Sequence, residues 1–318
     1  MVMLRHAISD ELVPGPPFSF ELTVRKPAGW DLFTPFEVYR DGVLWTALHI
    51  EGRLVGLRLT SLGTTDAPRI SVTAFTKSKL GSSTEHAMIH SIASKLGAFD
   101  DLAGFYSLAR TDDILRHTVE DLYGMHDTDY SGTFQATILA ICLQMATLKR
   151  SDEMMRSLAA NYGETAEFDG REVRVWPTPG VISGLHPREL ERNCRLGYRA
   201  KYLVGAAKVL SQGFPTIEEL EQLSEDEAKE KLMELPGIGD YSADIINPGR
   251  GFPIDAWSVD VFGKLFFGKE PVNAREAIER VKQEGIRRWG EWSWMAFFYV
   301  AQDLGNLSKK LGIELRLS

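Results

Sequence analysis

Cysteine is scarce in this sequence, because Cys142 and Cys194 are the only two among 318 residues. Two thiols cannot build a disulfide framework or a structural zinc site, nor a [4Fe–4S] cluster, which needs four thiolates. Long apolar runs are also missing, since no window approaches the roughly 18 apolar residues of a membrane-spanning helix. We therefore expect two ordinary thiols and a chain that does not cross a membrane.

The sequence also lacks an excess of basic residues, since its net charge is −8 at pH 7. This balance argues mildly against nucleic acid as a partner, but binding of DNA depends on local basic patches. Such a patch lies between Leu185 and Leu210, opposed only by Glu189 and Glu191. A solvated helix face is the alternative interpretation. The six basic residues are Arg188, Arg192, Arg195, Arg199, Lys201 and Lys208.

The first third of the chain is typical of an antiparallel sheet. Several runs are rich in β-branched or aromatic residues, and Glu51-Gly52 joins two of them as a short hairpin. A helix is expected over 83–96, capped by Ser83 or Thr84. The expected strands are FSFELTV (18–24), VLWTALHI (43–50), RLVGLRLT (53–60) and RISVTAF (69–75).

From about residue 103 the pattern becomes helical and shows no repeat or low-complexity linker. Residues 133–148 are expected to form a buried apolar helix, and a second helix follows over 151–163. Residues 165–187 are less regular, and 186–213 should form two helices. The class is therefore α+β, with an antiparallel sheet domain with one helix over 1–102 and a helical region over 103–318. Later helices are expected in TIEELEQL, EDEAKEKLMEL, NAREAIERVKQEGI and WSWMAFFYVAQDLGNL.

Residues 235–244 read Leu-Pro-Gly-Ile-Gly-Asp-Tyr-Ser-Ala-Asp and separate a charged helix from one that starts near Asp240. Gly237 and Gly239 permit a tight turn with positive φ and the close approach of another backbone. Ile238 can fill the space between the two helices. The free N–H groups of the second helix and its dipole would form an anion site that suits a DNA phosphate. A glycine-rich turn between two helices is the alternative interpretation.

A loop with glycine and proline follows the hairpin, GFPIDAWSVDVFGK (251–264), and Asp260 lies nineteen residues after Tyr241. The hairpin (235–241) and the loop (251–260) together resemble the helix-hairpin-helix/Gly-Pro-Asp superfamily of DNA glycosylases, in which such a loop carries a single catalytic aspartate. The resemblance implies that Asp260 is this carboxylate. Asp255 is the competing candidate, and a helix N-cap is the structural alternative for Asp260.

The resemblance extends over about 120–305. The segment LGYRAKYL (196–203) resembles one in 8-oxoguanine DNA glycosylases, and the N-terminal sheet suits both these enzymes and 3-methyladenine DNA glycosylase II. Bifunctional members of the superfamily carry a lysine two residues after the second hairpin glycine, and its amine forms a Schiff base with the sugar. Tyr241 occupies this position, which implies a monofunctional enzyme.

The positions that would face the base favour an alkylated purine. By the resemblance, Ala296 and Val300 replace the glutamine and phenylalanine of the 8-oxoguanine enzymes, while Tyr241 and Trp292 match two tryptophans of the alkylbase enzymes. Electron-rich rings attract a cationic purine and stack on a flipped base. Core packing is the alternative role for these rings. Three aromatic residues of the sheet domain would close the pocket: Trp30, Phe33 and Phe36.

A flipped base leaves a gap in the duplex that the enzyme must fill. The resemblance places the filling residue at Gln144-Met145, and methionine suits an irregular gap. A core position is the alternative for Met145. The remaining expected DNA contacts are Gly237, Ile238, Gly239, Arg199 and Lys201.

These features predict a base-excision DNA glycosylase that hydrolyses the N-glycosidic bond of a flipped alkylated purine such as 3-methyladenine in double-stranded DNA. We expect a soluble, intracellular monomer, cytoplasmic and nucleoid-associated or nuclear, with no metal or organic cofactor; the family's hairpin implies a monovalent cation. One alternative is an 8-oxoguanine glycosylase with a diverged pocket. Another is a DNA-binding module without catalysis, against which the carboxylate in the loop argues.

Overall fold

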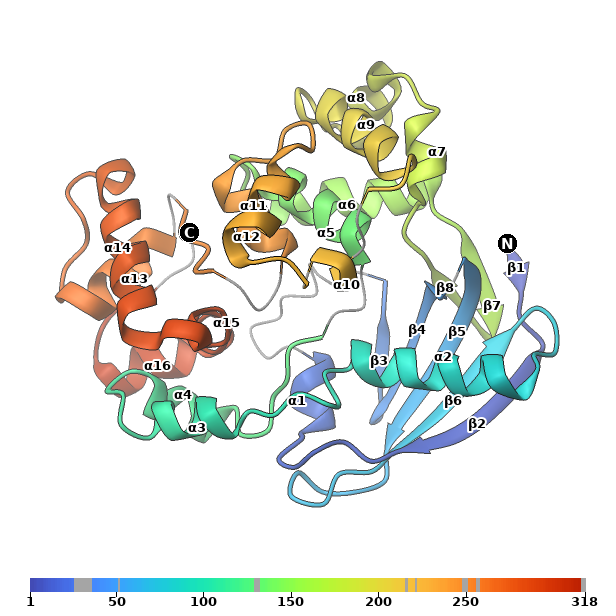
Figure 1. Ribbon diagram of the computed structural model, residues 1–318, viewed down its shortest axis with the longest axis horizontal. Coiled ribbons are helices and arrows are strands. Elements are labelled where there is room, and N and C mark those ends of the chain that lie inside the picture. The colour runs from blue at the N-terminus through green and yellow to red at the C-terminus, as the bar shows by residue number, and fades with distance from the viewer. Residues whose placement is uncertain are drawn as a thin grey trace.

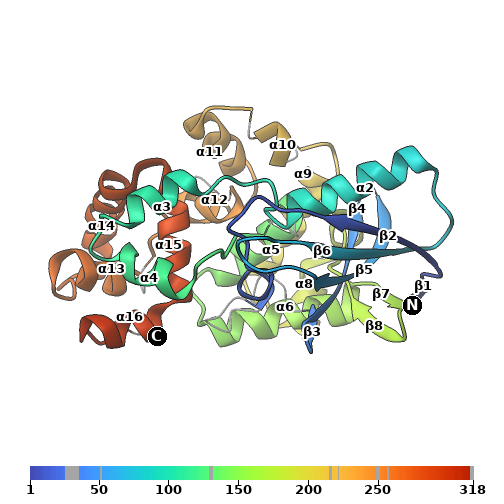
Figure 2. The same ribbon diagram turned by 90° about the horizontal axis from the view of Figure 1, so that it is seen from below.

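The computed structural model describes residues 1–25, 36–50, 52–128, 132–214, 217–220, 222–247, 251–255 and 258–315. A twisted sheet lies at one end of the molecule and the C-terminal helices lie at the other (Figure 1). The hairpin helices lie between these two ends. The view from below shows the same separation (Figure 2). The predicted α+β class is confirmed.

The main sheet is antiparallel, with the strand order β2-β6-β5-β4-β3. The pairing of Ile50 with Arg53 makes the predicted short hairpin between two strands. The prediction of a strand over 18–24 is wrong, because α1 (Phe20–Arg25) is a short helix that buries Phe20 and Val24. The strands are β2 (His6–Leu12), β3 (Val38–Arg40), β4 (Val43–Ile50), β5 (Arg53–Ser61) and β6 (Ile70–Thr76).

Each face of this sheet has its own cover. Helix α2 (Ser82–Lys95) packs on one face through Met88 and Ile92. Its N-cap is Gly81, which makes no side-chain cap hydrogen bond, so the predicted cap at Ser83 or Thr84 is wrong. A β-hairpin from the helical region packs on the other face. The ring centroids of Phe168 in this β-hairpin and Phe75 in the sheet are 5.2 Å apart. The hairpin strands β7 (Thr165–Phe168) and β8 (Arg171–Arg174) form a second sheet with β1 (Val2–Met3).

The irregular pattern over 165–187 thus contains two strands that belong to the sheet end of the molecule. They pair with β1, which runs parallel to β7. The domain boundary at residues 102 and 103 stays a prediction, although the helical region clearly contributes part of the core beneath the sheet.

The helical region is organised around two apolar cores. One gathers residues of α5, α6, α9 and α12, and the other gathers residues of α3, α4 and α13 to α16. No helix within the described residues is long and apolar enough to span a bilayer. The helices are α3 (Ala103–Ala109), α4 (Leu115–Asp121), α5 (Gly132–Leu143), α6 (Leu148–Tyr162), α7 (Pro179–Ser183), α8 (Pro187–Cys194), α9 (Arg199–Leu210), α10 (Ile217–Leu220), α11 (Glu225–Met233), α12 (Asp240–Ile246), α13 (Ser258–Phe267), α14 (Ala274–Trp289), the 3-10 helix η1 (Gly290–Trp292), α15 (Ser293–Gln302) and α16 (Leu304–Leu311).

The apolar helix predicted over 133–148 ends earlier, since α5 stops at Leu143 and the chain turns sharply before α6. Met145 in this turn has a φ of 46°, in the left-handed region. Helix α6 begins at Leu148, three residues before the predicted start, because the side chain of Thr147 caps it by accepting a hydrogen bond from the N–H of Arg150. The turn between α5 and α6 lies beside the predicted hairpin.

Candidate functional site

The hairpin predicted from the sequence joins α11 to α12. The N–H of Ile238 bonds to the carbonyl of Leu235 at 3.0 Å and closes the turn, and the side chain of Ile238 is buried between the helices. Gly237 has a φ of +82°, and a Cβ there would lie 2.5 Å from Cγ of Tyr202. Only glycine fits this position without a shift of its neighbours.

Gly239 plays a different part in the same hairpin. Its φ is −114°, a value open to any residue, and a Cβ on Gly239 would meet no atom within 4 Å. The expectation that both glycines adopt positive φ is therefore wrong for Gly239. Because Gly239 has no side chain, the space at the N-terminus of α12 is open, and a ligand could approach the helix there.

The turn after α5 is bonded directly to this hairpin. The side-chain amide of Gln144 donates to the carbonyl of Gly237 at 2.6 Å and to the hydroxyl of Ser242 at 3.2 Å. Met145 follows with 90% of its surface exposed. The alternative of a core position for Met145 is therefore wrong. The structure brings an exposed, unbranched side chain and the predicted hairpin to the same surface.

The prediction that Arg199 contacts DNA needs a correction. Arg199 is only 9% exposed. Its guanidinium donates to the carbonyls of Gln144 and Met145, the latter at 3.1 Å. Arg199 therefore holds the turn in place from inside the protein. Lys201 is exposed, with its ammonium 4.8 Å from the centre of the Tyr202 ring, and its role as a DNA contact stays a prediction.

Tyr198 was missed by the sequence-based reasoning, although it lies in the segment LGYRAKYL. Its side chain is 48% exposed, and the guanidinium of Arg199 lies 4.6 Å from the centre of its ring. The Tyr198 hydroxyl is 3.5 Å from the carbonyl of Gln144. A large exposed ring at the start of α9 thus lies next to the turn that carries Met145.

The loop after α12 is anchored at both of its ends. Gly251 packs against the carboxylate of Asp244, and its carbonyl accepts a hydrogen bond of 3.1 Å from Ser293. At the other end, Asp255 and Ser258 bond reciprocally. The Ser258 hydroxyl accepts from the N–H of Asp255 at 2.9 Å and donates to Oδ1 of Asp255 at 2.8 Å, while the N–H of Ser258 donates to the same Oδ1 at 2.9 Å.

The carboxylate of Asp255 also accepts a hydrogen bond from the hydroxyl of Tyr241. Burial raises the pKa of the Tyr241 phenol, and the charge and hydrogen bond of Asp255 raise it further, so the phenol remains a donor. The structure thus joins the hairpin to the loop through a tyrosine and an aspartate. The two residues lie fourteen positions apart in the chain.

Asp260 is the carboxylate that the sequence spacing favours as catalytic, but it is not the partner of Tyr241. It is in the first turn of α13, on the side of Lys264 and Glu270. Burial and the nearby charge of Glu270 raise the pKa of Asp260, while Lys264 opposes the shift. Lys264 bonds to Glu270 at 2.7 Å and to the carbonyl of Glu314 at 2.8 Å. The carboxylate that meets Tyr241 is that of the competing candidate, Asp255.

Solved structures of DNA glycosylases have the same fold as this chain. A 3-methyladenine DNA-glycosylase from Archaeoglobus fulgidus has a TM-score of 0.77 at 22% identity, over 94% of this chain and 99% of that one. An 8-oxoguanine glycosylase/lyase from Clostridium acetobutylicum, in complex with double-stranded DNA, has a TM-score of 0.68 at 16% identity, over 96% and 99% of the two chains. The fold is that of a DNA glycosylase.

The sequence relatives agree with this fold. A DNA-3-methyladenine glycosylase of Bacillus subtilis is 23% identical over 63% of this chain and 67% of its own length. A probable N-glycosylase/DNA lyase of Methanothermobacter thermautotrophicus is 24% identical over 68% of this chain and 73% of its own length. No protein-family profile matches the chain. The predicted resemblance to base-excision DNA glycosylases is confirmed by these relatives and neighbours.

The expected aromatic pocket stays a prediction, because Trp292 and Tyr241 pack on different cores. Trp292 is partly buried and packs on α3, where a Cβ on Gly104 would lie 2.8 Å from its ring. It belongs to the core of the C-terminal helices, whereas Tyr241 packs on the core of the hairpin helices. The ring of Phe36 lies 4.9 Å from that of Trp176. Trp30 and Phe33 lie outside the described residues.

By the resemblance, two positions distinguish the 8-oxoguanine enzymes from the alkylbase enzymes, and in this protein both positions are buried in the protein core. Ala296 and Val300 both lie on α15 and have no exposed surface. Both pack in the core formed by α3, α4 and the C-terminal helices. Neither side chain has a polar group that could bind a base.

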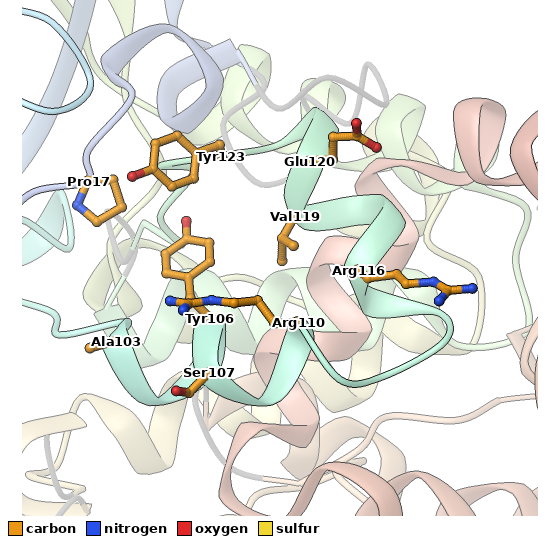
Figure 3. A pocket seen from close by; sticks show the side chains of 9 residues that line it. All are labelled: Pro17, Ala103, Tyr106, Ser107, Arg110, Arg116, Val119, Glu120 and Tyr123. Atoms are coloured by element: carbon orange, nitrogen blue, oxygen red, sulfur yellow. The ribbon is translucent and has the colours of Figure 1, made fainter.

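A cavity of about 490 Å³ lies between α3 and α4, away from the hairpin. Tyr106 and Tyr123 stand on one side of it and Val119 lies opposite, while Arg116 points away from its centre (Figure 3). None of the predicted site residues lines this cavity. It is therefore separate from the Tyr241–Asp255 pair of the glycosylase fold.

Proposed function

We propose that this protein is a monofunctional DNA glycosylase that hydrolyses the N-glycosidic bond of an alkylated purine such as 3-methyladenine. The observation that carries the proposal is the group beside Asp255, which is the phenol of Tyr241. A Schiff base with the sugar requires an amine. With a phenol in that place, water is the nucleophile and the product is an abasic site.

In this reaction Asp255 is the catalytic carboxylate. Its negative charge stabilises the positive charge that develops on the sugar as the bond from C1′ to the base breaks. The bonding electron pair leaves with the base, the oxygen of water bonds to C1′, and one proton of the water passes to Asp255. Hydrogen bonds from Ser258 and Tyr241 keep the carboxylate in one orientation.

The proposed substrate class follows from the chemistry of the leaving group and from the residue types at the positions that would recognise 8-oxoguanine. An alkylated purine such as 3-methyladenine is cationic, so it departs without protonation by the enzyme. At the two positions that the resemblance assigns to recognition of 8-oxoguanine, Ala296 and Val300 carry no hydrogen-bonding group that would select that base. Stacking of the base on Tyr241 and Trp292, with Trp30 and Phe33 closing the pocket, remains a proposal.

We propose that the protein engages double-stranded DNA as a monomer. The backbone of the hairpin from Gly237 to Gly239 binds a phosphate, for which the open space at Gly239 leaves room. Met145 enters the gap that the flipped base leaves, because it is exposed on a turn held by Arg199 and Gln144. The exposed ring of Tyr198 lies beside it and contacts the neighbouring base pair.

No metal or organic cofactor is needed for this hydrolysis, since water is the nucleophile and Asp255 accepts its proton. A monovalent cation at the carbonyls of the hairpin is a further proposal. Among these carbonyls, that of Gly237 already accepts a hydrogen bond from Gln144, so a cation would share it.

The deciding experiment is incubation of the protein with a panel of duplexes, each with one damaged base, followed by identification of the released bases. We expect 3-methyladenine to be released faster than 8-oxoguanine, and borohydride to trap no covalent adduct. A preference for 8-oxoguanine would support the alternative 8-oxoguanine glycosylase. A protein that binds DNA and releases no base would be the alternative binding module.

A further inference from the structure

Two lysines and two aspartates from three helices form a closed ion-pair network beside the hairpin. Lys229 of α11 lies 2.6 Å from Asp240 and 2.8 Å from Asp244, measured from Nζ to the carboxylate oxygens. Lys282 of α14 lies 2.9 Å from Asp240 and 2.6 Å from Asp244. Each lysine therefore contacts both aspartates, and the four charges sum to zero.

The two aspartates differ in their surroundings. The Asp244 side chain is 6% exposed and packs against Gly251, at the start of the loop that carries Asp255. A buried carboxylate of this kind requires a cation as its partner. The Asp240 side chain is 65% exposed and belongs to the first residue of α12, directly after Gly239. One lysine would balance Asp244, and the second balances Asp240.

An acidic residue at this place should hinder DNA binding. An unpaired carboxylate repels a phosphate that approaches the hairpin, because both groups are negatively charged. In the network, burial alone would raise the pKa of Asp240, but hydrogen bonds and charges from Lys229 and Lys282 outweigh it and lower this pKa. Asp240 therefore stays ionised and paired.

We infer that Lys229 and Lys282 cancel the charge of Asp240, and that this pairing makes the hairpin acceptable to the DNA backbone. The inference rests on the proposed function, since it takes the hairpin as the surface that meets DNA. It identifies two lysines, neither of them adjacent to the hairpin in sequence, as determinants of DNA affinity. The ligand is the sugar-phosphate backbone, so the effect does not depend on the damaged base.

The test is a charge series measured on undamaged duplex between about 50 and 200 mM salt. The network carries no net charge in the wild type, one positive charge in Asp240→Asn and one negative charge in Lys282→Met. The double variant is again neutral. We expect Asp240→Asn to bind several-fold more tightly than wild type and Lys282→Met several-fold more weakly. The double variant should bind about as tightly as wild type, and all differences should shrink at high salt.

Glu11→Gln is the matched control. Glu11 is exposed on the sheet and pairs with Arg69 at 2.6 and 2.8 Å, so its loss changes the net charge as Asp240→Asn does, but away from the hairpin. Its affinity should equal that of wild type. Melting temperatures are compared in parallel, since Lys282→Met also removes a partner of buried Asp244.

The inference is overturned if Asp240→Asn binds no more tightly than wild type, or if the double variant stays as weak as Lys282→Met. The first of these outcomes is informative even where Lys282→Met folds poorly, because Asp240 is exposed. A wild-type protein that releases bases without the expected order of affinities overturns only this inference. A wild type that neither binds duplex nor releases a base overturns the proposed function as well.

Discussion

The hydroxyl of Tyr241, in the hairpin, donates a hydrogen bond to the carboxylate of Asp255, in the following loop. This bond joins the predicted DNA-binding element to the predicted catalytic loop. It also places the aromatic ring of Tyr241 between the hairpin core and the carboxylate. The chemistry proposed for the enzyme depends on this pair, and the first two predictions test it.

Asp255→Asn should abolish base release and leave DNA affinity nearly unchanged. The substitution keeps the shape and the hydrogen bonds to Ser258 but removes the charge that stabilises the sugar cation. We expect the single-turnover rate to fall at least a hundredfold, or about 2.7 kcal/mol. Asp260→Asn is the control and should retain most of the rate. The reverse order would return the catalytic role to Asp260.

Tyr241→Lys should convert the enzyme to a glycosylase with lyase activity. The tip of this side chain reaches Asp255, so an amine there would lie at the sugar and could form a Schiff base. Borohydride should trap an adduct with this variant and none with wild type or Tyr241→Phe. An adduct trapped with wild type would show that another amine attacks the sugar.

The two hairpin glycines should respond differently to alanine. Gly237→Ala forces a Cβ to within 2.5 Å of Tyr202 at a φ of +82°, so its melting temperature should fall by several degrees. Gly239→Ala meets no atom within 4 Å and should melt as wild type does. Its binding to damaged and undamaged duplex should weaken equally, because a Cβ would enter the space left for the phosphate. Normal binding by Gly239→Ala would place the phosphate elsewhere.

Met145→Asn should separate stability from activity. Asparagine tolerates the left-handed backbone at this position, and the side chain it replaces is 90% exposed, so the melting temperature should not fall. Base release from duplex should slow about tenfold because the gap is no longer filled by an apolar side chain. Release from single-stranded DNA, which leaves no such gap, serves as the internal control. Equal loss on both substrates would contradict a wedge role.

Stability should depend on pH through Asp303, at the end of α15. Burial raises the pKa of this carboxyl to about 7; a hydrogen bond from Asn306 opposes the rise, and the charge of Asp121 adds to it. Because the folded protein binds this proton more tightly than the unfolded chain does, the contribution of Asp303 is fully favourable below about pH 4 and is lost as the pH rises through about 7.

Asp303→Asn should therefore raise the melting temperature at pH 8 by a few degrees and have little effect at pH 4. The amide oxygen preserves the contact with Asn306, which donates at 2.9 Å. Glu120→Gln is the control. It changes an exposed carboxylate that pairs with Lys310, as Asp121 also does, and it should leave the pH dependence of stability in place. Equal effects of Asp303→Asn at both values of pH would exclude this origin.

The local sequence alone determined the hairpin and most of the helices. Leu-Pro-Gly-Ile-Gly places a residue with positive φ between two amphipathic segments, and glycine adopts that conformation without strain. The strands at 43–50 and 53–60 followed in the same way from their β-branched runs and the short turn between them. The pattern of apolar and polar residues along an element indicates which of its faces is buried, but it does not indicate which other element covers that face.

Tertiary structure alone decided which carboxylate meets Tyr241. Asp255 and Asp260 both follow the hairpin, and their separation in sequence does not say how the loop between them and the hairpin is folded. Anchors from distant elements, Asp244 of α12 and Ser293 of α15, hold Gly251 and so fix the course of the loop. Arg199 is a second example. The sequence shows that this residue is a cation, but only the packing of the folded chain decides that its guanidinium donates to the carbonyls of residues 144 and 145 and not to DNA.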